Sequence, residues 1–295
     1  MNSTGLAGGA YNATVQFVSN DLTQNPLIIP VQLTVTGGGT VNVNVTLTSG
    51  WNLVSNPVLT ALDSVRQLYP ASSFEYAFTF DAVLGYVQRS RLENGVGYWA
   101  KFPGAVIQTV SGLTDDQDTV TVGPGWNIIG SLTSPVDTAT ITSFPAGLVL
   151  SPYYGFNNGY SPSATMVPGH AYWVKSAGTG ILVMSSTVAG SEQPAALQSS
   201  PVLEGMSWIR ISDSDGGSQT LYIGGTEQEA GRTELPPPGP EGMLDVRFES
   251  GRMMEALPSG SGWQRGIALR ASAWPVTVEW EVKGDIENLR IADGV

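Results

Sequence analysis

The stretch Gly50-Trp51-Asn52-Leu53-Val54-Ser55 returns later in the chain as Gly125-Trp126-Asn127-Ile128-Ile129-Gly130. A second phrase follows each copy, first as Gly97-Tyr98-Trp99-Ala100-Lys101 and then as Ala171-Tyr172-Trp173-Val174-Lys175. The copies of the first phrase are 75 residues apart, and those of the second phrase are 74 apart. This period is longer than that of most solenoid repeats, so the sequence predicts a pair of small modules copied from one unit.

Composition places the chain in the all-β class. Its 295 residues include 36 glycines and 19 prolines, with Val, Thr, Ile and aromatic residues in the short runs between them. Short β-branched runs separated by turn residues are typical of strands, and this length allows two or three domains. We therefore predict an all-β chain of several sandwich-like or barrel-like modules with an internal two-copy repeat.

Charge and cysteine content exclude several classes of function. The formal net charge is −12, which repels a polyanion and argues against nucleic acid as a partner. The chain has no cysteine, so disulfides and thiolate metal sites are impossible and each module is expected to depend on its own core. No apolar run reaches the roughly 18 residues of a membrane span, so we expect no membrane insertion.

Changes in composition divide the chain into parts. Residues 11–36 alternate apolar and polar side chains in two runs, which predicts a hairpin whose unpaired edges favour self-association. Glycine 37–39 is a joint, and residues 189–201 have the composition of a linker. The predicted modules cover residues 1–36, 40–112, 113–188 and 202–295, and both ends have the appearance of a chain cut from a longer polypeptide.

Aromatic residues are the first candidates for a site. Four tryptophans recur at matched positions, and these are Trp51, Trp99, Trp126 and Trp173. Residues kept in both copies indicate a need of the fold, so we expect these rings to pack in the cores, with the stems of the following lysines 101 and 175 over them. A loop that stacks a sugar ring is a second possibility, with packing as its alternative. Its candidate residues are Tyr153, Tyr154, Phe156 and Tyr160.

Catalytic and metal-binding patterns are sparse. His170 is the only histidine and aligns with Val96, so the repeat itself does not require an imidazole. Without a cysteine or a second histidine, a His-based zinc site or a Cys-His couple cannot form, and a Gly-x-Ser-x-Gly elbow is absent. We predict no catalytic residue.

Clusters of aspartate leave calcium as the one cofactor to consider. Asp213 and Asp215 lie in a predicted hairpin turn, and residues 115–118 contribute three further aspartates between the repeats. Neither group continues as an EF-hand loop, and short acidic turns are commonly just solvated turns. Asp213 and Asp215 are therefore weak calcium candidates. Paired carboxylates also keep open an enzyme that acts on glycosides.

Three stretches carry a resemblance to bacterial surface proteins. The GWN and YWxK phrases resemble a repeat of large secreted proteins of Bacteroidetes, Chlorobi and Ignavibacteria. Residues 10–36 resemble the last two strands of Ig-like domains of the BACON-like group. The segments 234–240, 244–248 and 274–280 resemble the β-module that precedes the sorting domain of type IX secretion cargo, although the sorting domain itself is not in this sequence.

The resemblance implies a non-catalytic structural or adhesive segment of a secreted or cell-surface bacterial protein. Its location would be extracellular or on the outer cell surface, with the export signal outside this sequence, and its partners a polysaccharide or a protein there. The alternatives are a carbohydrate-binding accessory region of a secreted hydrolase and, third, a carboxylate-based enzyme acting on glycosides.

Overall fold

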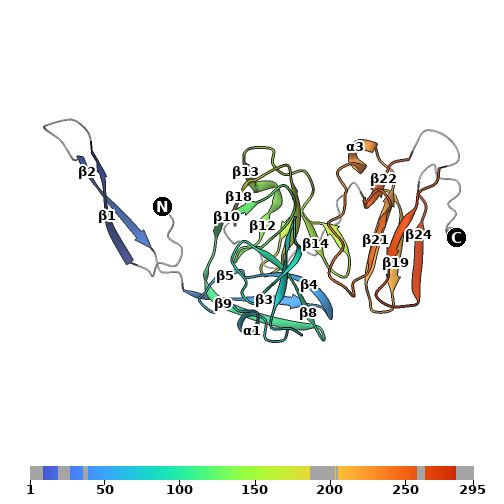
Figure 1. Cartoon of the computed structure of the whole chain (residues 1–295), viewed down its shortest axis with the longest axis horizontal. Coiled ribbons are helices and arrows are strands. Elements are labelled where there is room, and N and C mark those ends of the chain that lie inside the picture. The colour runs from blue at the N-terminus through green and yellow to red at the C-terminus, as the bar shows by residue number, and fades with distance from the viewer. Residues whose placement is uncertain are drawn as a thin grey trace.

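A computed structural model of the chain describes residues 9–18, 27–35, 39–186, 203, 205–257 and 263–283. The protein is all-β, as the composition predicts, and its named helices are short (Figure 1). They are α1 Val65–Leu68, α3 Glu227–Ala230 and the 3-10 turn η1 Thr138–Thr140. Within these ranges the structure has no helix long and apolar enough to cross a membrane. The predicted linker and the end of the chain lie outside the described residues.

A hairpin stands at the start of the chain, projecting away from the other strands (Figure 1). Strands β1 Gly9–Phe17 and β2 Leu27–Val35 pair antiparallel, with Val15 opposite Ile29. Both of these side chains are exposed. Self-association through this hairpin stays a prediction, which a comparison of oligomer mass with and without residues 1–36 would test.

The first repeat contains two antiparallel sheets. One has the order β3-β9-β5 and the other the order β4-β8-β6-β7. The strands are β3 Thr40–Leu47, β4 Gly50–Ser55, β5 Val58–Leu59, β6 Ala77–Asp81, β7 Gly85–Arg89, β8 Gly97–Phe102 and β9 Val106–Thr114.

The second repeat has a four-stranded sheet of corresponding order, β11-β17-β14-β15, beside the sheets β10-β18-β13 and β12-β16. In both repeats the GWN strand pairs with the strand that carries the Tyr-Trp phrase. The strands are β10 Gln117–Val122, β11 Gly125–Ile129, β12 Val136–Asp137, β13 Thr142–Phe144, β14 Tyr154–Phe156, β15 Tyr160–Pro162, β16 Thr165–Met166, β17 Tyr172–Ser176 and β18 Gly180–Ser185. Descent of the two repeats from one copied unit stays a prediction.

The turn before each GWN strand shows why glycine and asparagine recur in that phrase. Gly50 and Gly125 have φ angles of +90° and +86°, which favour glycine. The Asn52 side chain accepts from the Thr48 amide at 3.0 Å and donates to the Thr48 carbonyl at 2.9 Å. Asn127 makes the same two bonds with the backbone of Gly123, both at 2.9 Å. Each asparagine therefore closes the turn that starts its strand.

The two repeats are joined by reciprocal backbone hydrogen bonds. The Ser55 amide of the first repeat donates to the Gly169 carbonyl of the second at 2.9 Å. The Gly130 amide of the second repeat donates to the Gly95 carbonyl of the first, also at 2.9 Å. Because Ser55 and Gly130 are the last residues of the two GWN phrases, the four-stranded sheets are related by an approximate two-fold arrangement.

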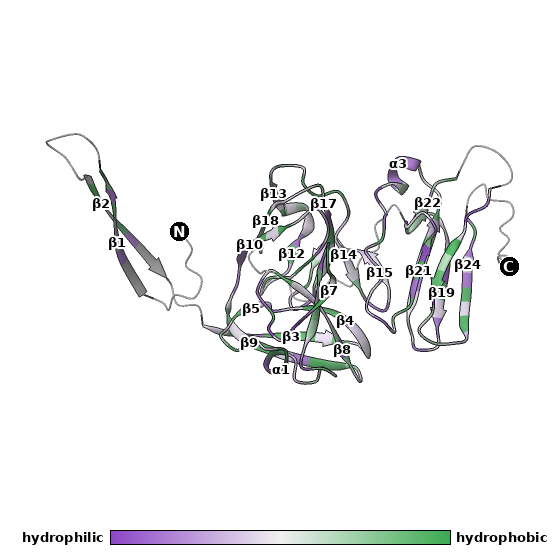
Figure 2. Cartoon of the chain, viewed as in Figure 1, coloured by the Kyte–Doolittle hydropathy of each residue, from purple (hydrophilic) through white to green (hydrophobic). Residues whose placement is uncertain are grey.

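The C-terminal module contains a four-stranded sheet of order β22-β20-β19-β24 and a two-stranded sheet β21-β23. Strands β20 and β22 are parallel, and the predicted hairpin is formed by β19 and β20. Figure 2 shows hydrophobic and hydrophilic bands alternating along β24. The strands are β19 Ser207–Asp213, β20 Ser218–Ile223, β21 Asp245–Phe248, β22 Met254–Glu255, β23 Ile267–Arg270 and β24 Val276–Glu281.

The hydrophobic cores do not follow the predicted module boundaries. Each repeat has a core of its own, around Val45 in the first and Leu182 in the second. A third cluster joins rings of both repeats, including Trp99, to Leu221 and Phe248 of the C-terminal module. The expectation that each module depends on its own core alone is therefore wrong.

Asp115 is a buried carboxyl at the passage from the first repeat to the second. It is only 6% exposed, and the Asn94 amide lies 3.5 Å from its Oδ2 atom. Burial raises the pKa of Asp115 to about 7, with smaller contributions from the charges of Asp118 and Asp116. An unfolded aspartate has a pKa of roughly 3.9, so between these values the folded chain holds a proton that the unfolded chain releases.

Stability should therefore fall as pH rises from about 4 through 7, because Asp115 must ionise in a site that disfavours its charge. We predict that Asp115→Asn is more stable than the wild type at pH 8 by about 1–4 kcal/mol. The gain should vanish near pH 4. Urea unfolding at pH 4, 6 and 8 measures it, and a difference independent of pH would contradict the role given to Asp115.

Candidate functional site

Rings from the two four-stranded sheets meet in one surface, which we call the aromatic face. Trp99 of the first repeat contacts Phe156 of the second, with centroids 4.8 Å apart and planes at 79°. Trp173 of the second repeat contacts Phe80 of the first at 5.0 Å and 64°. The face consists of Trp51, Phe80, Tyr86 and Trp99 from the first repeat and Trp126, Tyr154, Phe156, Tyr160 and Trp173 from the second.

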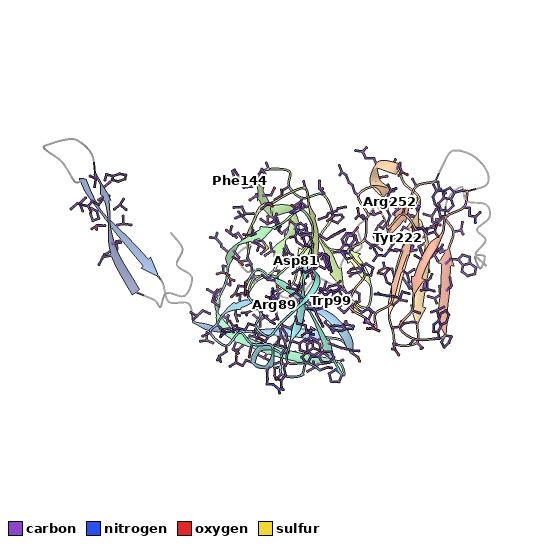
Figure 3. All side chains as sticks on the ribbon, viewed as in Figure 1. Asp81, Arg89, Trp99, Phe144, Tyr222 and Arg252 are labelled. Carbon is purple, nitrogen blue, oxygen red and sulfur yellow. The ribbon has the colours of Figure 1, made fainter. Side chains whose placement is uncertain are left out.

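These contacts follow from the strand registers. Phe78 lies opposite Trp99 in the first repeat, and Tyr154 lies opposite Trp173 in the second. Side chains two residues further along the same strands, Phe80 and Phe156, fall on the same side of their sheets, since strand side chains alternate. Each phenylalanine thus reaches the tryptophan of the other repeat. Figure 3 places Trp99 inside the packed repeats.

The aromatic face holds residues 234–241 of the C-terminal module, a proline-rich segment that we call the strap. Trp126 Nε1 donates to the Glu234 side chain at 3.3 Å, at the start of the strap. Trp51 Nε1 donates to the Glu241 carbonyl at 3.2 Å, at its end. Lys175 forms an ion pair with Glu234 and lies over the Trp126 ring, so it supports the first contact.

Two tyrosines hold the middle of the strap. The Tyr160 hydroxyl donates to the Pro237 carbonyl at 3.2 Å, and the Tyr86 hydroxyl donates to the Pro238 carbonyl at 2.9 Å. Burial raises the pKa of both tyrosines well above the usual range, so both hydroxyls remain protonated donors at physiological pH. Tyr86 lies in β7 and Tyr160 is the first residue of β15, and these strands hold matching places in the two sheets. Equivalent residues of both repeats therefore bind adjacent carbonyls.

The C-terminal module supports the strap from its other side. Arg247 Nη2 donates to the Pro236 carbonyl at 2.9 Å, and Arg270 Nη2 donates to the Gly239 carbonyl at 3.0 Å. Proline lacks a backbone donor, so its carbonyls are the groups available for recognition. The strap is therefore bound between the repeats and the strands β21 and β23.

A second contact joins the turn between β14 and β15 to strand β20. The Ser218 amide donates to the Asn158 carbonyl at 2.7 Å. The buried Gln219 side chain accepts from the Tyr160 amide at 2.8 Å and donates to the Tyr160 carbonyl at 3.1 Å. A Cβ atom on Gly159 would lie 1.9 Å from the Ser218 carbonyl oxygen, so only glycine permits this approach.

The exposed sugar-stacking loop predicted from Tyr153, Tyr154, Phe156 and Tyr160 is not present. Tyr153 and Tyr160 are 7% exposed, Tyr154 is fully buried, and Phe156 is half-buried. Phe156 and Tyr160 contact Trp99 of the first repeat, Tyr154 contacts Trp126, and Tyr153 packs in the second repeat's own core. An exposed platform at this loop was the wrong expectation.

The four matched tryptophans all lie in the aromatic face, but they have two different environments. Trp99 and Trp173 are fully buried. Trp51 and Trp126 lie at the margin and donate to the strap. This second role was not predicted from the sequence, although the proline run between Glu234 and Glu241 is a visible signal of a bound segment.

The remaining candidate groups are engaged locally. The Asp213 carboxylate accepts from the Gly217 amide at 2.8 Å and from the Ser272 hydroxyl, so it closes its own hairpin turn, whereas Asp215 is exposed. Among the described residues no group of three or more His, Cys, Asp or Glu side chains is placed to hold a metal ion. His170 is enclosed between the repeats, where burial lowers its pKa to about 4 and keeps it neutral.

Comparisons with protein-family models, curated proteins and solved structures find no match to this chain.

The contact at Gly159 gives a direct test of the docking geometry. We predict that Gly159→Ala lowers the free energy of unfolding by about 1–3 kcal/mol, because the added methyl group meets the Ser218 carbonyl. Gly178→Ala is the matched control, since nothing lies within 4 Å of a Cβ there. Urea unfolding of both variants decides the matter, and equal stabilities would show that the turn is not seated on β20.

Proposed function

We propose that this chain is a non-catalytic structural or adhesive segment of a secreted or cell-surface bacterial protein, in which the paired repeats anchor the C-terminal module. The observation that carries the proposal is the strap. Matched side chains of both repeats, Trp51 with Trp126 and Tyr86 with Tyr160, direct their donors at a segment of the same chain. These matched donors thus hold the C-terminal module against the repeats.

The carbohydrate-binding alternative loses its main support. A carbohydrate-binding site would present coplanar exposed rings, but the aromatic loop is enclosed by the repeats and by β20. The Trp51 and Trp126 rings are also covered on one side by lysines, with Lys101 Nζ 5.7 Å and Lys175 Nζ 5.9 Å from the ring centroids. Such cation–π contacts stabilise a surface ring and leave less of its face free for a sugar.

Among the described residues, the carboxylate-enzyme alternative has one acid whose pKa is raised toward neutrality, Asp115, but its surroundings do not favour catalysis. General acid–base chemistry needs the carboxyl within reach of a substrate. Asp115 is 6% exposed, and its amide is bound by the Thr133 hydroxyl, which in turn donates to the Pro57 carbonyl. The location of Asp115 at the junction of the repeats favours a structural role for its carboxyl group.

The outer-surface location rests on the resemblance of the GWN and YWxK phrases to a repeat of large secreted bacterial proteins. Detection of the parent protein on intact cells, with an antibody against this segment, tests the location, and a purely cytoplasmic signal would contradict it.

The anchoring role predicts that the two parts stay together without a covalent connection. We expect a chain cut at a protease site introduced within residues 189–201 to elute as one species of the original size, because the shared core and the strap hold the pieces. Size-exclusion chromatography before and after cutting measures this. Two separate peaks at micromolar concentration would contradict the proposal.

A further inference from the structure

We propose that the aromatic face is a peptide-binding site for a proline-rich segment that begins with an acidic residue, and that the strap is its built-in ligand. This inference rests on the proposed anchoring role and specifies its chemistry. If the site is of this kind, a short peptide with the sequence of the strap binds the aromatic face without the rest of the C-terminal module.

The order of contacts along the strap supports a linear peptide site. Trp126 binds residue 234, Tyr160 binds 237, Tyr86 binds 238 and Trp51 binds 241. The two tyrosines thus bind the centre and the two tryptophans bind the ends, in an arrangement that matches the approximate two-fold relation of the repeats. A face built this way binds about eight consecutive residues of a peptide.

The donors and acceptors fit a proline-rich ligand. Three of the four contacts go to backbone carbonyls of the strap, from ring hydroxyl and indole groups. Grooves lined by aromatic residues recognise proline-rich segments in this way, because the proline run is extended beforehand and loses little entropy on binding. Residues 235–240 of the strap carry no charge, which suits a face made of rings.

The one charged side chain that is bound, at the start of the strap, fixes the direction in which a peptide lies on the aromatic face. The side chain of Glu234 accepts from Trp126 and pairs with Lys175, whereas the contact at the other end is to the Glu241 carbonyl. The aromatic face therefore binds an acidic side chain at the first position of the peptide and a backbone carbonyl at the last. Because the ion pair is partly exposed, Lys175→Met should weaken binding by only about two- to fivefold.

The test uses the full chain with Pro236, Pro237 and Pro238 replaced by serine, so that its own strap competes poorly. A fluorescent peptide with the sequence of residues 232–243 is titrated into this variant and into the wild type, with anisotropy as the readout. We expect saturable binding to the variant and at least tenfold weaker binding to the wild type, whose face is filled. A peptide with the same three serines should bind neither protein.

Removal of the two central donors gives the residue-level test. In the serine variant, Tyr86→Phe combined with Tyr160→Phe should weaken peptide binding by about 5- to 150-fold, since two hydrogen bonds are lost. Tyr76→Phe is the matched control, because no hydrogen bond of its hydroxyl is seen among the described residues, and it should leave the affinity unchanged. Equal affinities for the double variant and the control would overturn the assigned contacts.

A second measurement covers the case in which the serine variant does not fold. Excess peptide is added to the wild-type protein cut within residues 189–201, and release of the C-terminal piece is followed by size exclusion. Release by the wild-type peptide and not by its serine version supports the site. If the cut pieces stay associated and no peptide binds or competes, the peptide site is wrong while the anchoring role stands.

Discussion

Two edge-on ring contacts set the arrangement on which the rest of this structure depends. Trp99 meets Phe156, and Trp173 meets Phe80, each pair crossing from one repeat to the other. Such contacts add about 0.5–1.5 kcal/mol each beyond the burial of the rings. Together with the backbone hydrogen bonds between the two sheets, they gather the remaining rings into one cluster, and side chains of the C-terminal module complete that core.

A nearly symmetric face binds an asymmetric partner, and the differences between the repeats show how. The turn of the second repeat at Asn158 is bound by β20. The corresponding hairpin tip of the first repeat leaves Val83 and Leu84 90% and 75% exposed. Two sheets of the same strand order therefore have different contacts, because the C-terminal module packs against only one of their hairpins.

Local features of this fold could be predicted from sequence, because they depend on neighbouring residues. Alternation of the valines at 41, 43 and 45 with polar residues predicts strand β3, the turn at Asp213 to Gly217 predicts the β19–β20 hairpin, and the spacing of Val65 and Leu68 predicts the helical turn α1. The burial of Tyr160 could not be predicted this way, since it depends on Gln219 and Pro237, which lie 59 and 77 residues away in the chain. The matched tryptophans indicated a core, but only the structure shows that Trp126 and Trp51 donate to Glu234 and Glu241 at the two ends of the strap.

The central claim is that the repeats and the C-terminal module form one cooperative unit through the aromatic face. Native-state hydrogen exchange tests it most directly, by comparing the opening free energies of amides in β4 and β11 with those in β19 and β20. We predict that the slowest amides of all four strands share one opening free energy and one dependence on denaturant. Opening of β19 and β20 at a clearly lower free energy, with β4 and β11 still protected, would contradict the account.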